Sequence, residues 1–237
     1  MDESAGAGAG PATGEVPEVG VGPWEGPWPK GAGEPDSVYD VALLEQGDRR
    51  NVVDRYRYWS LEAIRADLDT RRHGFHVAIE NWQHDFNIGA IVRTANAFLA
   101  AEVHIVGKRR WNKRGAMVTD RYQHVRHHES AEDLAAYLAD YKTDDGGPVP
   151  LLGIDNLPGS EHLETMALPR RVCFLFGQEG PGLSAAAREA CAGTFSIAQF
   201  GSTRSINASA AAAIAMHSWV RLHADLSGDA DAGAWRG

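Results

Sequence analysis

The chain has 237 residues, 43% of them hydrophobic, so we expect one substantial core and one domain with appendages. No apolar run approaches the roughly 20 residues of a membrane-spanning helix, and MDESAGAGAG lacks the features of a signal peptide. We therefore expect a cytoplasmic protein with no membrane partner. Two cysteines, Cys173 and Cys191, are too few for a disulfide framework or a cysteine-based zinc site. Their apolar surroundings predict two buried thiols.

The net charge of −9 arises near the N-terminus. Residues 1–48 hold ten acidic residues against Lys30 alone, whereas residues 49–237 carry 22 acidic and 22 basic residues. Within this neutral remainder, residues 108–126 concentrate positive charge around a single acid, Asp120. The basic residues there are Lys108, Arg109, Arg110, Lys113, Arg114, Arg121 and Arg126. This segment is a candidate phosphate-binding surface, and a solvated charged loop is the alternative.

The N-terminal region lacks a clear periodic pattern. Residues 1–35 are rich in Gly, Pro, Ala and Glu, which predicts a disordered acidic tail because such a segment cannot repay the entropy of ordering. Trp24 and Trp28 can dock on the folded domain or on a partner, but the pattern favours a mobile tail. Residues 36–73 are expected to form a helical extension, in which Ser60 can cap a helix beginning LEAIRADLDTRR. A flexible tail is expected at residues 226–237.

Residues 74–225 are expected to form the functional domain. Short apolar strands alternate there with helices, which is typical of an α/β fold with a parallel sheet covered on both faces. The expected strands are FHVAI (75–79), EVHIVG (102–107), VPLLGI (149–154), RVCFLF (171–176) and TFSIA (194–198). The expected helices are residues 88–99, 131–141, 184–191 and 207–223.

The first polar motif opens the helix that follows the first strand. Asn87 is a good N-terminal cap, and Ile88, Ile91 and Val92 supply an apolar stripe. Arg93 falls within this apolar half of the helix, so it need not point straight into solvent. An amphipathic helix with a surface arginine explains this motif equally well when it is taken alone.

The second motif is a glycine-rich turn directly after a strand, Phe176-Gly177-Gln-Glu179-Gly180-Pro-Gly182-Leu-Ser184. Glycines let a backbone approach a ligand closely, and open α/β sheets bind ligands at the carboxyl ends of their strands. A dinucleotide-binding turn is the competing interpretation. That fingerprint opens a βαβαβ unit, whereas only about 55 residues follow here.

The third motif runs from Ile197 into the last helix. Ser205, Asn207 and Ser209 place hydroxyl and amide groups at the helix start, where unpaired N–H groups collect. Simple capping explains Ser209 but not the whole cluster.

Together the motifs resemble those of the SpoU (TrmH-type) branch of the SPOUT methyltransferase superfamily, over about residues 74–224. The N-x-G-A-x-x-R-T-A run is matched by Asn87 and Arg93, and G-x-E-x-x-G is matched by Gly177, Glu179 and Gly182. The third motif is matched, with its spacings intact, by Ile197, Gly201, Ser205, Asn207, Ser209 and Ile214. The departures are Ala198-Gln199 in place of Pro-Met and Ile206 in place of Leu.

The resemblance implies a sheet whose C-terminal segment is threaded into a deep trefoil knot. It implies S-adenosylmethionine as the cofactor, contacted by Gly177, Ile197 and Ile206 in that knot. The implied reaction is methyl transfer to a ribose 2′-hydroxyl of tRNA or rRNA. The region before Phe75 is too short for a full separate RNA-binding domain, which leans toward tRNA.

The resemblance also assigns catalytic roles. In the family the motif arginine is proposed as the base, but a guanidinium is normally taken never to deprotonate in proteins. We therefore expect Arg93 to orient the nucleophile and to stabilise developing negative charge. Asn87 and Glu179 are expected to form a polar pair that shapes the pocket, and Ser205 and Asn207 to position substrate or the motif loops. Glu179 is an alternative base if burial raises its pKa.

Three expectations about partners follow. The family is dimeric, which implies a homodimer with sites assembled from both protomers. Lys108, Arg109, Arg110, Lys113 and Arg114, interleaved with Trp111 and Tyr122, are expected to track an RNA backbone. No metal is expected, because neither carboxylate nor cysteine accompanies His124, His127 and His128 at ligand spacing.

Two rival functions come from other classes. One is a knotted-fold RNA-binding protein without catalytic activity, which the intact set of Asn87, Arg93, Glu179 and Asn207 argues against. The other is a nucleotide-dependent oxidoreductase built on the glycine turn, which the C-terminal position of residues 177–182 argues against.

Overall fold

The computed structural model describes residues 20–82, 87–141 and 147–227, which belong to two compact units divided between Ser60 and Leu61. The helices are α1 (Val41–Gln46), α2 (Leu61–Asp69), α3 (Asn87–Ala97), α4 (Ala131–Asp140), α5 (Ala185–Ala190) and α6 (Ala208–His223). The strands are β1 (Phe75–Asn81), β2 (Val103–Gly107), β3 (Val125–His128), β4 (Leu151–Ile154), β5 (Glu161–His162), β6 (Val172–Phe176) and β7 (Gly193–Ser196). Short 3-10 helices lie at Asp54–Tyr56, Lys113–Ala116, Thr119–Arg121 and Leu163–Thr165.

The second unit is built on a seven-stranded sheet of order β3-β2-β1-β6-β4-β7-β5, and the strand pairs within its described residues are parallel. In β1 and β6 every residue is buried. Strands buried on both faces appear in a sequence as continuous apolar runs, and VCFLF in β6 is such a run. The expected α/β fold with a parallel sheet is confirmed.

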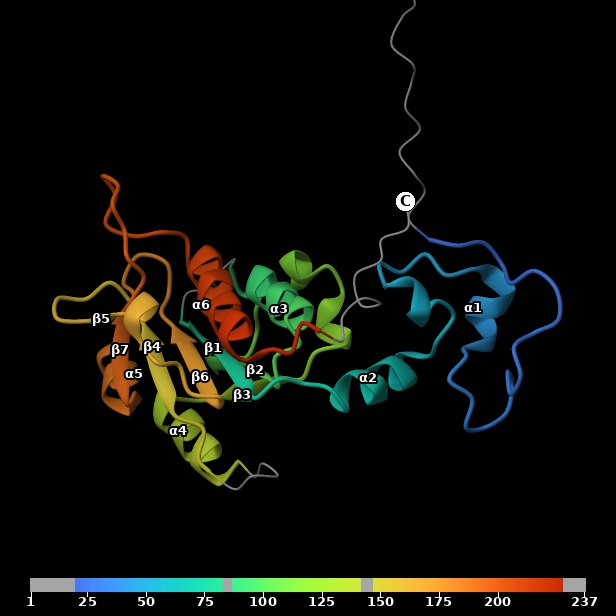
Figure 1. Cartoon of the computed structure of the whole chain (residues 1–237), viewed down its shortest axis with the longest axis horizontal. Coiled ribbons are helices and arrows are strands. Elements are labelled where there is room, and N and C mark those ends of the chain that lie inside the picture. The colour runs from blue at the N-terminus through green and yellow to red at the C-terminus, as the bar shows by residue number, and fades with distance from the viewer. Residues whose placement is uncertain (1–19, 83–86, 142–146, 228–237) are drawn as a thin grey trace, which may run out of the picture. The chain divides into compact units, whose positions relative to one another are not determined.

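Two pairs of helices cover the sheet (Figure 1). α3 and α6 pack together over one face, where Phe75 and Phe174 point into the core with Met216 and Trp219 of α6. α4 and α5 cover the opposite face, where Leu175 meets Leu134 of α4. The described helices are not long and apolar enough to cross a membrane.

The helices and strands lie close to their predicted positions, with two additions. The predicted apolar strands correspond to β1, β2, β4, β6 and β7, and the predicted helices to α3, α4, α5 and α6. The edge strands β3 and β5 were not predicted, because neither contains an apolar run. Cys173 is buried and Cys191 is partly buried; burial raises the pKa of the Cys191 thiol to about 12.

The first unit differs from the tail predicted for residues 1–35. Val21 pairs with Asp48 in an antiparallel bridge, and the Trp24 ring meets Tyr58 edge-on at 5.3 Å between centroids. The Tyr58 hydroxyl donates to the Gly22 carbonyl at 2.7 Å. Aromatic side chains thus order a glycine-rich segment that composition alone predicts to be mobile. Residues 1–19 and 228–237, the remainder of the two predicted tails, lie outside the described residues.

The boundary between the units also differs from the sequence-based division. Helix α2 and the residues after it belong to the second unit rather than to an extension ending at residue 73. The Arg72 guanidinium explains this, because it donates to the carbonyls of Ala100 and Tyr122, at 3.2 and 2.8 Å. A sequence pattern does not reveal such contacts across 28 and 50 residues.

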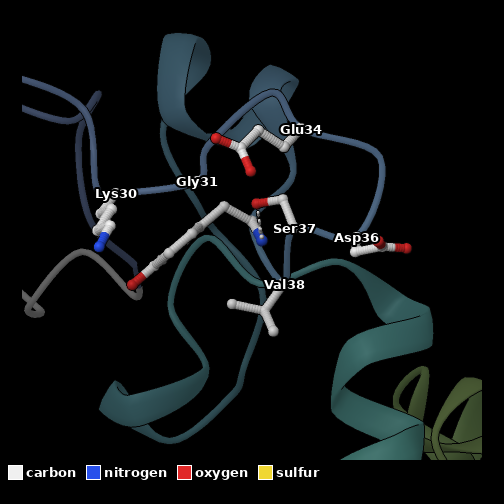
Figure 2. A pocket seen from close by; sticks show the side chains of 7 residues that line it. Lys30, Gly31, Glu34, Asp36, Ser37 and Val38 are labelled. Atoms are coloured by element: carbon white, nitrogen blue, oxygen red, sulfur yellow. Dashed lines mark hydrogen bonds between the residues drawn. The ribbon is translucent and has the colours of Figure 1, made fainter.

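A small hollow of about 270 Å³ lies within the first unit (Figure 2). Its wall is a loop that carries Lys30, Glu34 and Asp36, and the Tyr39 N–H donates to the Ser37 hydroxyl at 3.1 Å. None of the three polar motifs contributes to this hollow. The candidate functional site therefore lies in the second unit, which contains all three motifs.

Candidate functional site

A pocket of about 290 Å³ lies at the carboxyl edge of three neighbouring strands, β6, β4 and β7. Its lining comes from the segments that follow these strands and from the start of α6. Most of the predicted catalytic and cofactor-binding residues converge here, namely Gly177, Glu179, Ile197, Ser205, Ile206 and Asn207. The carboxyl edge of an open parallel sheet is the usual position for a ligand site.

The glycine turn forms one wall of the pocket through close backbone contact. A Cβ atom on Gly177 would lie 2.1 Å from the Gly182 carbonyl carbon, so no other residue fits at position 177 without movement of the backbone. Gly182 has a φ of 71°, which disfavours other residues. Gln178 and Gly182 exchange two backbone hydrogen bonds, of 3.2 and 3.0 Å. The glycines therefore make a tight closed turn.

Asn87 connects all three motifs. Its Nδ2 donates to Glu179 Oε2 at 3.0 Å, and its Oδ1 accepts from Asn207 Nδ2 at 2.8 Å. Asn207 in turn caps α6, because its Oδ1 accepts from the backbone N–H groups of Ser209 and Ala210, at 2.9 and 3.2 Å. The predicted pairing of Asn87 with Glu179 is thus present, and Asn207 extends it.

Two polar pocket residues were not predicted from the sequence. Asp155 and Asn156 follow β4, and each binds one motif loop. Asp155 Oδ2 accepts from the Leu183 N–H at 2.8 Å, whereas Asn156 Nδ2 donates to the Arg204 carbonyl at 2.8 Å. The available signal was their position, since polar residues directly after a buried strand lie at the ligand-binding edge of a parallel sheet.

Glu80 holds the glycine turn where the turn leads into α5. This fully buried carboxylate is on the last residue but one of β1, and its Oε2 accepts from the Ser184 N–H at 2.8 Å. Ser184 caps α5 as predicted, through a 3.1 Å bond from the Ala187 N–H. The turn is therefore held at both ends, by Glu80 beside α5 and by Asn87 at Glu179.

Arg93 lies apart from this cluster. Its side chain is exposed on α3, and the lining of the pocket in the described chain does not include it. The apolar neighbours Ile91 and Val92 had left an inward-facing arginine open as an expectation, and both neighbours are indeed buried. Turning about 100° per residue carries Arg93 from that buried stripe to the exposed side.

The basic segment is mostly exposed, as a nucleic-acid surface requires. Lys108, Arg109, Arg110 and Arg114 are exposed, and Asn81 Nδ2 fixes the start of the segment by donating to the carbonyls of Lys108 and Arg110. Lys113 is also exposed but forms an ion pair with Asp120 at 2.9 Å.

Tyr122 and Arg126 of this segment, and His128 just beyond it, contact other parts of the protein. Tyr122 is 8% exposed, so its ring is not free to contact RNA. His128 is buried and contacts His104, with 3.0 Å between Nε2 and Nδ1. Arg126 forms an ion pair with Glu102 at 2.6 Å. The candidate contact surface is therefore residues 108–114, with Arg121 as a further exposed basic residue.

Comparison with known proteins adds independent information. A family model described as the SpoU rRNA Methylase family matches residues 74–217, which contain the three motifs. No curated protein matches the sequence.

Solved structures share the fold of the second unit. The SpoU methyltransferase AviRb from Streptomyces viridochromogenes, in complex with AdoMet, is 26% identical with a TM-score of 0.57; the match covers 66% of this chain and 60% of AviRb. The A. aeolicus TrmH/SpoU tRNA modifying enzyme is 17% identical with a TM-score of 0.57, covering 68% and 81%. An AdoMet-bound rRNA methyltransferase from Sinorhizobium meliloti is 22% identical with a TM-score of 0.55, covering 68% and 61%. The chain thus matches less than two thirds of AviRb.

Proposed function

Because the chain belongs to the SpoU rRNA methylase family, we propose that it is an S-adenosylmethionine-dependent methyltransferase acting on a ribose 2′-hydroxyl of tRNA or rRNA. We assign the reaction to residues 74–225. The observation that carries this proposal is the joining of three separate motifs around one pocket, through Asn87, Glu179 and Asn207. A binding protein without activity has no need for this set together with Arg93.

The pocket suits S-adenosylmethionine. Ile154, Phe176, Ile197 and Ile206 offer apolar surface for an adenosine, and the glycine turn brings backbone groups close. The volume of about 290 Å³ is near the lower end of small-molecule sites. Within residues 20–82, 87–141 and 147–227, the buried Oε1 of Gln199 has no hydrogen-bond partner, so it is available to a donor group of a ligand.

When bound, S-adenosylmethionine supplies a sulfonium methyl group. In the transfer, a bond forms between the ribose 2′-oxygen and the methyl carbon while the carbon–sulfur bond breaks and its electron pair leaves with sulfur. The 2′-hydroxyl proton passes to a base. The protein must therefore align the oxygen and stabilise the negative charge that develops on it.

We assign alignment and charge stabilisation to Arg93, whose guanidinium keeps its charge and carries several N–H donors. Ser205 and Asn207 position the substrate or the motif loops. Glu179 is the alternative base; its side chain is exposed, so the burial on which this alternative was predicted is absent. A pH–rate profile tests this role, because Glu179→Gln abolishes the acidic limb of the profile if the Glu179 carboxylate takes the proton and leaves that limb in place if it does not.

We further propose that two copies complete each site. Arg93 is exposed and outside the pocket lining, so a second chain can supply it. Large apolar side chains are exposed on and before α6, as a dimer interface requires: Phe200 (98%), Ile206 (37%), Ile214 (40%) and Leu222 (47%). A monomer at micromolar concentration in sedimentation would contradict this proposal.

Mixing two inactive variants tests the composite site directly. Arg93→Ala keeps the pocket but lacks the arginine, whereas Gly177→Val blocks the pocket but keeps the arginine. In a mixed dimer, the pocket of the first chain meets Arg93 of the second, so activity returns. If each chain held a whole site, the mixture would stay inactive.

The C-terminal trefoil knot belongs to this proposal as well. Support comes from the strand order, in which β6 lies between β1 and β4 and β7 pairs with β4. A chain trace in a crystal structure tests it. We also propose a cytoplasmic location, and the proposed RNA substrate is its only support.

Two measurements test the activity. Calorimetry with S-adenosylmethionine and with NAD separates a methyltransferase from an oxidoreductase, since we expect binding of the first alone. Mapping 2′-O-methyl groups in total RNA, with and without the gene, identifies the nucleotide. The proposal would be overturned if every 2′-O-methyl group were still present without the gene and the protein did not bind S-adenosylmethionine.

A further inference from the structure

A buried polar cluster lies on the face of the sheet that α4 covers. His76 of β1 and His104 of β2 are 1% and 0% exposed, and Glu102, directly before β2, is 4% exposed. In the parallel register Val77 lies opposite Val103 and Ala78 opposite His104, so these three side chains share one face. They lie at the amino ends of the strands, whereas the pocket lies at the carboxyl ends.

We propose that His76, Glu102 and His104 form a site for one divalent transition-metal ion of the zinc type. His76 Nδ1 and His104 Nε2 are 3.0 Å apart, and Glu102 Oε2 is 3.9 Å from each nitrogen. The point equidistant from the corners of a triangle with these sides lies about 2.1 Å from each corner. Zinc–nitrogen and zinc–oxygen bonds measure about 2.0–2.2 Å. An ion therefore fits between the three atoms with little movement.

The two histidines are in the protonation state that binds metal. Burial lowers the pKa of His76 to about 4, and burial together with the neighbouring histidines lowers the pKa of His104 further below its usual value. Both rings are neutral at pH 7, and a neutral imidazole offers one bare nitrogen. Binding an ion at His76 Nδ1 and His104 Nε2 needs only a change of tautomer, so no proton is released from these two rings.

Hydrogen bonds from neighbouring residues orient two of the proposed metal ligands, His104 and Glu102. With its proton on Nδ1, His104 donates to His128 Nε2, 3.0 Å away. Arg126 Nε donates to Glu102 Oε1 at 2.6 Å, and the Tyr137 hydroxyl donates to Glu102 Oε2 at 2.7 Å. Metal-binding histidines usually have such an outer partner, and metal-binding carboxylates are usually hydrogen-bonded.

Two histidines and a carboxylate leave a fourth position open, which water or the Tyr137 hydroxyl can fill. The cluster joins neighbouring strands and lies on the opposite face from α3 and α6, so its role is structural. This cluster was not predicted from the sequence, because Glu102 and His104 lie 26 and 28 residues after His76 and meet it only through strand pairing.

Titration of the chelator-treated full chain with ZnCl₂ tests the site. We expect one ion per chain by calorimetry and a melting temperature about 5 to 10 °C higher at a free zinc concentration one hundred times Kd. CoCl₂ should give the intense visible absorption of four-coordinate cobalt. No saturable binding at one equivalent in the wild type would overturn the proposal.

Variants locate the ion. We expect His76→Gln and Glu102→Gln to weaken zinc affinity at least tenfold, whereas His217→Gln, on the exposed side of α6, should bind like the wild type. Equal binding by all variants would contradict the assignment. If the buried variants fail to fold, X-ray absorption of the zinc-loaded wild type decides, because a first shell with two imidazoles supports the site and a shell without imidazole excludes it.

Discussion

Asn207 Nδ2 donates a 2.8 Å hydrogen bond to Asn87 Oδ1 across 120 residues of sequence, joining the start of α6 to the start of α3. Asn87 also donates to Glu179, so one amide side chain uses its donor and its acceptor on two different motifs. The shape of the pocket thus depends on a short polar chain that no single motif contains.

The first prediction changes that amide to a carboxylate. Asn87→Asp keeps the acceptor for Asn207 but replaces the donor to Glu179 with an oxygen, which places two carboxylates in contact. We expect S-adenosylmethionine affinity to fall about tenfold or more, because a broken bond to a charged group costs about 1.5–3 kcal/mol. Calorimetry measures this, with Asn51→Asp at an exposed position as the control. Unchanged affinity would exclude Asn87 from shaping the pocket.

The second prediction concerns Arg93. Arg93→Lys keeps the charge but loses the planar array of donors, so we expect kcat to fall about 10²-fold or more while RNA binding stays near normal. Single-turnover methylation and a filter-binding assay measure the two quantities. Arg188→Lys, exposed on α5, is the matched control. Near wild-type turnover in Arg93→Lys would refute the assigned role.

The third prediction concerns the exposed basic residues. Reversal of charge in Arg109→Glu/Arg110→Glu should weaken RNA binding and lower the slope of log K against log salt by about two, if each residue contacts one phosphate. Arg188→Glu reverses a charge on α5 and serves as the control. RNA affinity and salt slope equal to those of the wild type would show that residues 108–114 are only a solvated loop.

The fourth prediction tests Asp155, which sequence reasoning missed. Its Oδ2 accepts from the Leu183 N–H and its Oδ1 from the Asn156 N–H, at 2.8 and 2.7 Å. Asp155→Asn turns one acceptor into a donor facing an N–H group, so the glycine turn should loosen and cofactor affinity should fall about tenfold. Asp140→Asn, exposed at the end of α4, is the control. The same affinity in both variants would count against a positioning role for Asp155.

The fifth prediction is a pH dependence in the first unit. Asp48 is fully buried, and burial raises its pKa; bonds from Arg50 and from the Tyr58 N–H outweigh burial and hold the pKa below its usual value. A carboxyl whose pKa is lower in the folded state stabilises the fold above the unfolded pKa, about 3.9, and loses that contribution as pH falls through the folded value.

Asp48→Asn should therefore lower the free energy of unfolding at pH 7 by about 2 to 3 kcal/mol. The difference from wild type should shrink below about pH 3.9. Urea unfolding followed by tryptophan fluorescence measures this, and Asp54→Asn, whose side chain is 73% exposed, is the control. A difference that stays constant down to pH 2 would show that the Asp48 charge contributes nothing.

The sequence predicted the central strands because both are buried on both faces, so that β6 is a continuous apolar run, VCFLF, and β1 contains the shorter run VAI. It could not predict β3, whose sequence VRHH is polar, since that edge strand is defined only by its pairing with β2. Motif spacing located Gly177, Glu179 and Asn207. For Asp155 the only signal was its position directly after a buried strand, because its partner Leu183 lies 28 residues away and is brought near only by the folded sheet.

The span of sequence that supplies the pocket lining has a consequence for synthesis of the protein. Its lining begins at Ile154 and ends at Ala211, in the first turn of α6. We therefore propose that a growing chain completes the pocket only after the start of α6 has left the ribosome and Asn207 has reached Asn87. On this proposal, S-adenosylmethionine binds after the sheet has folded and does not guide its earlier steps.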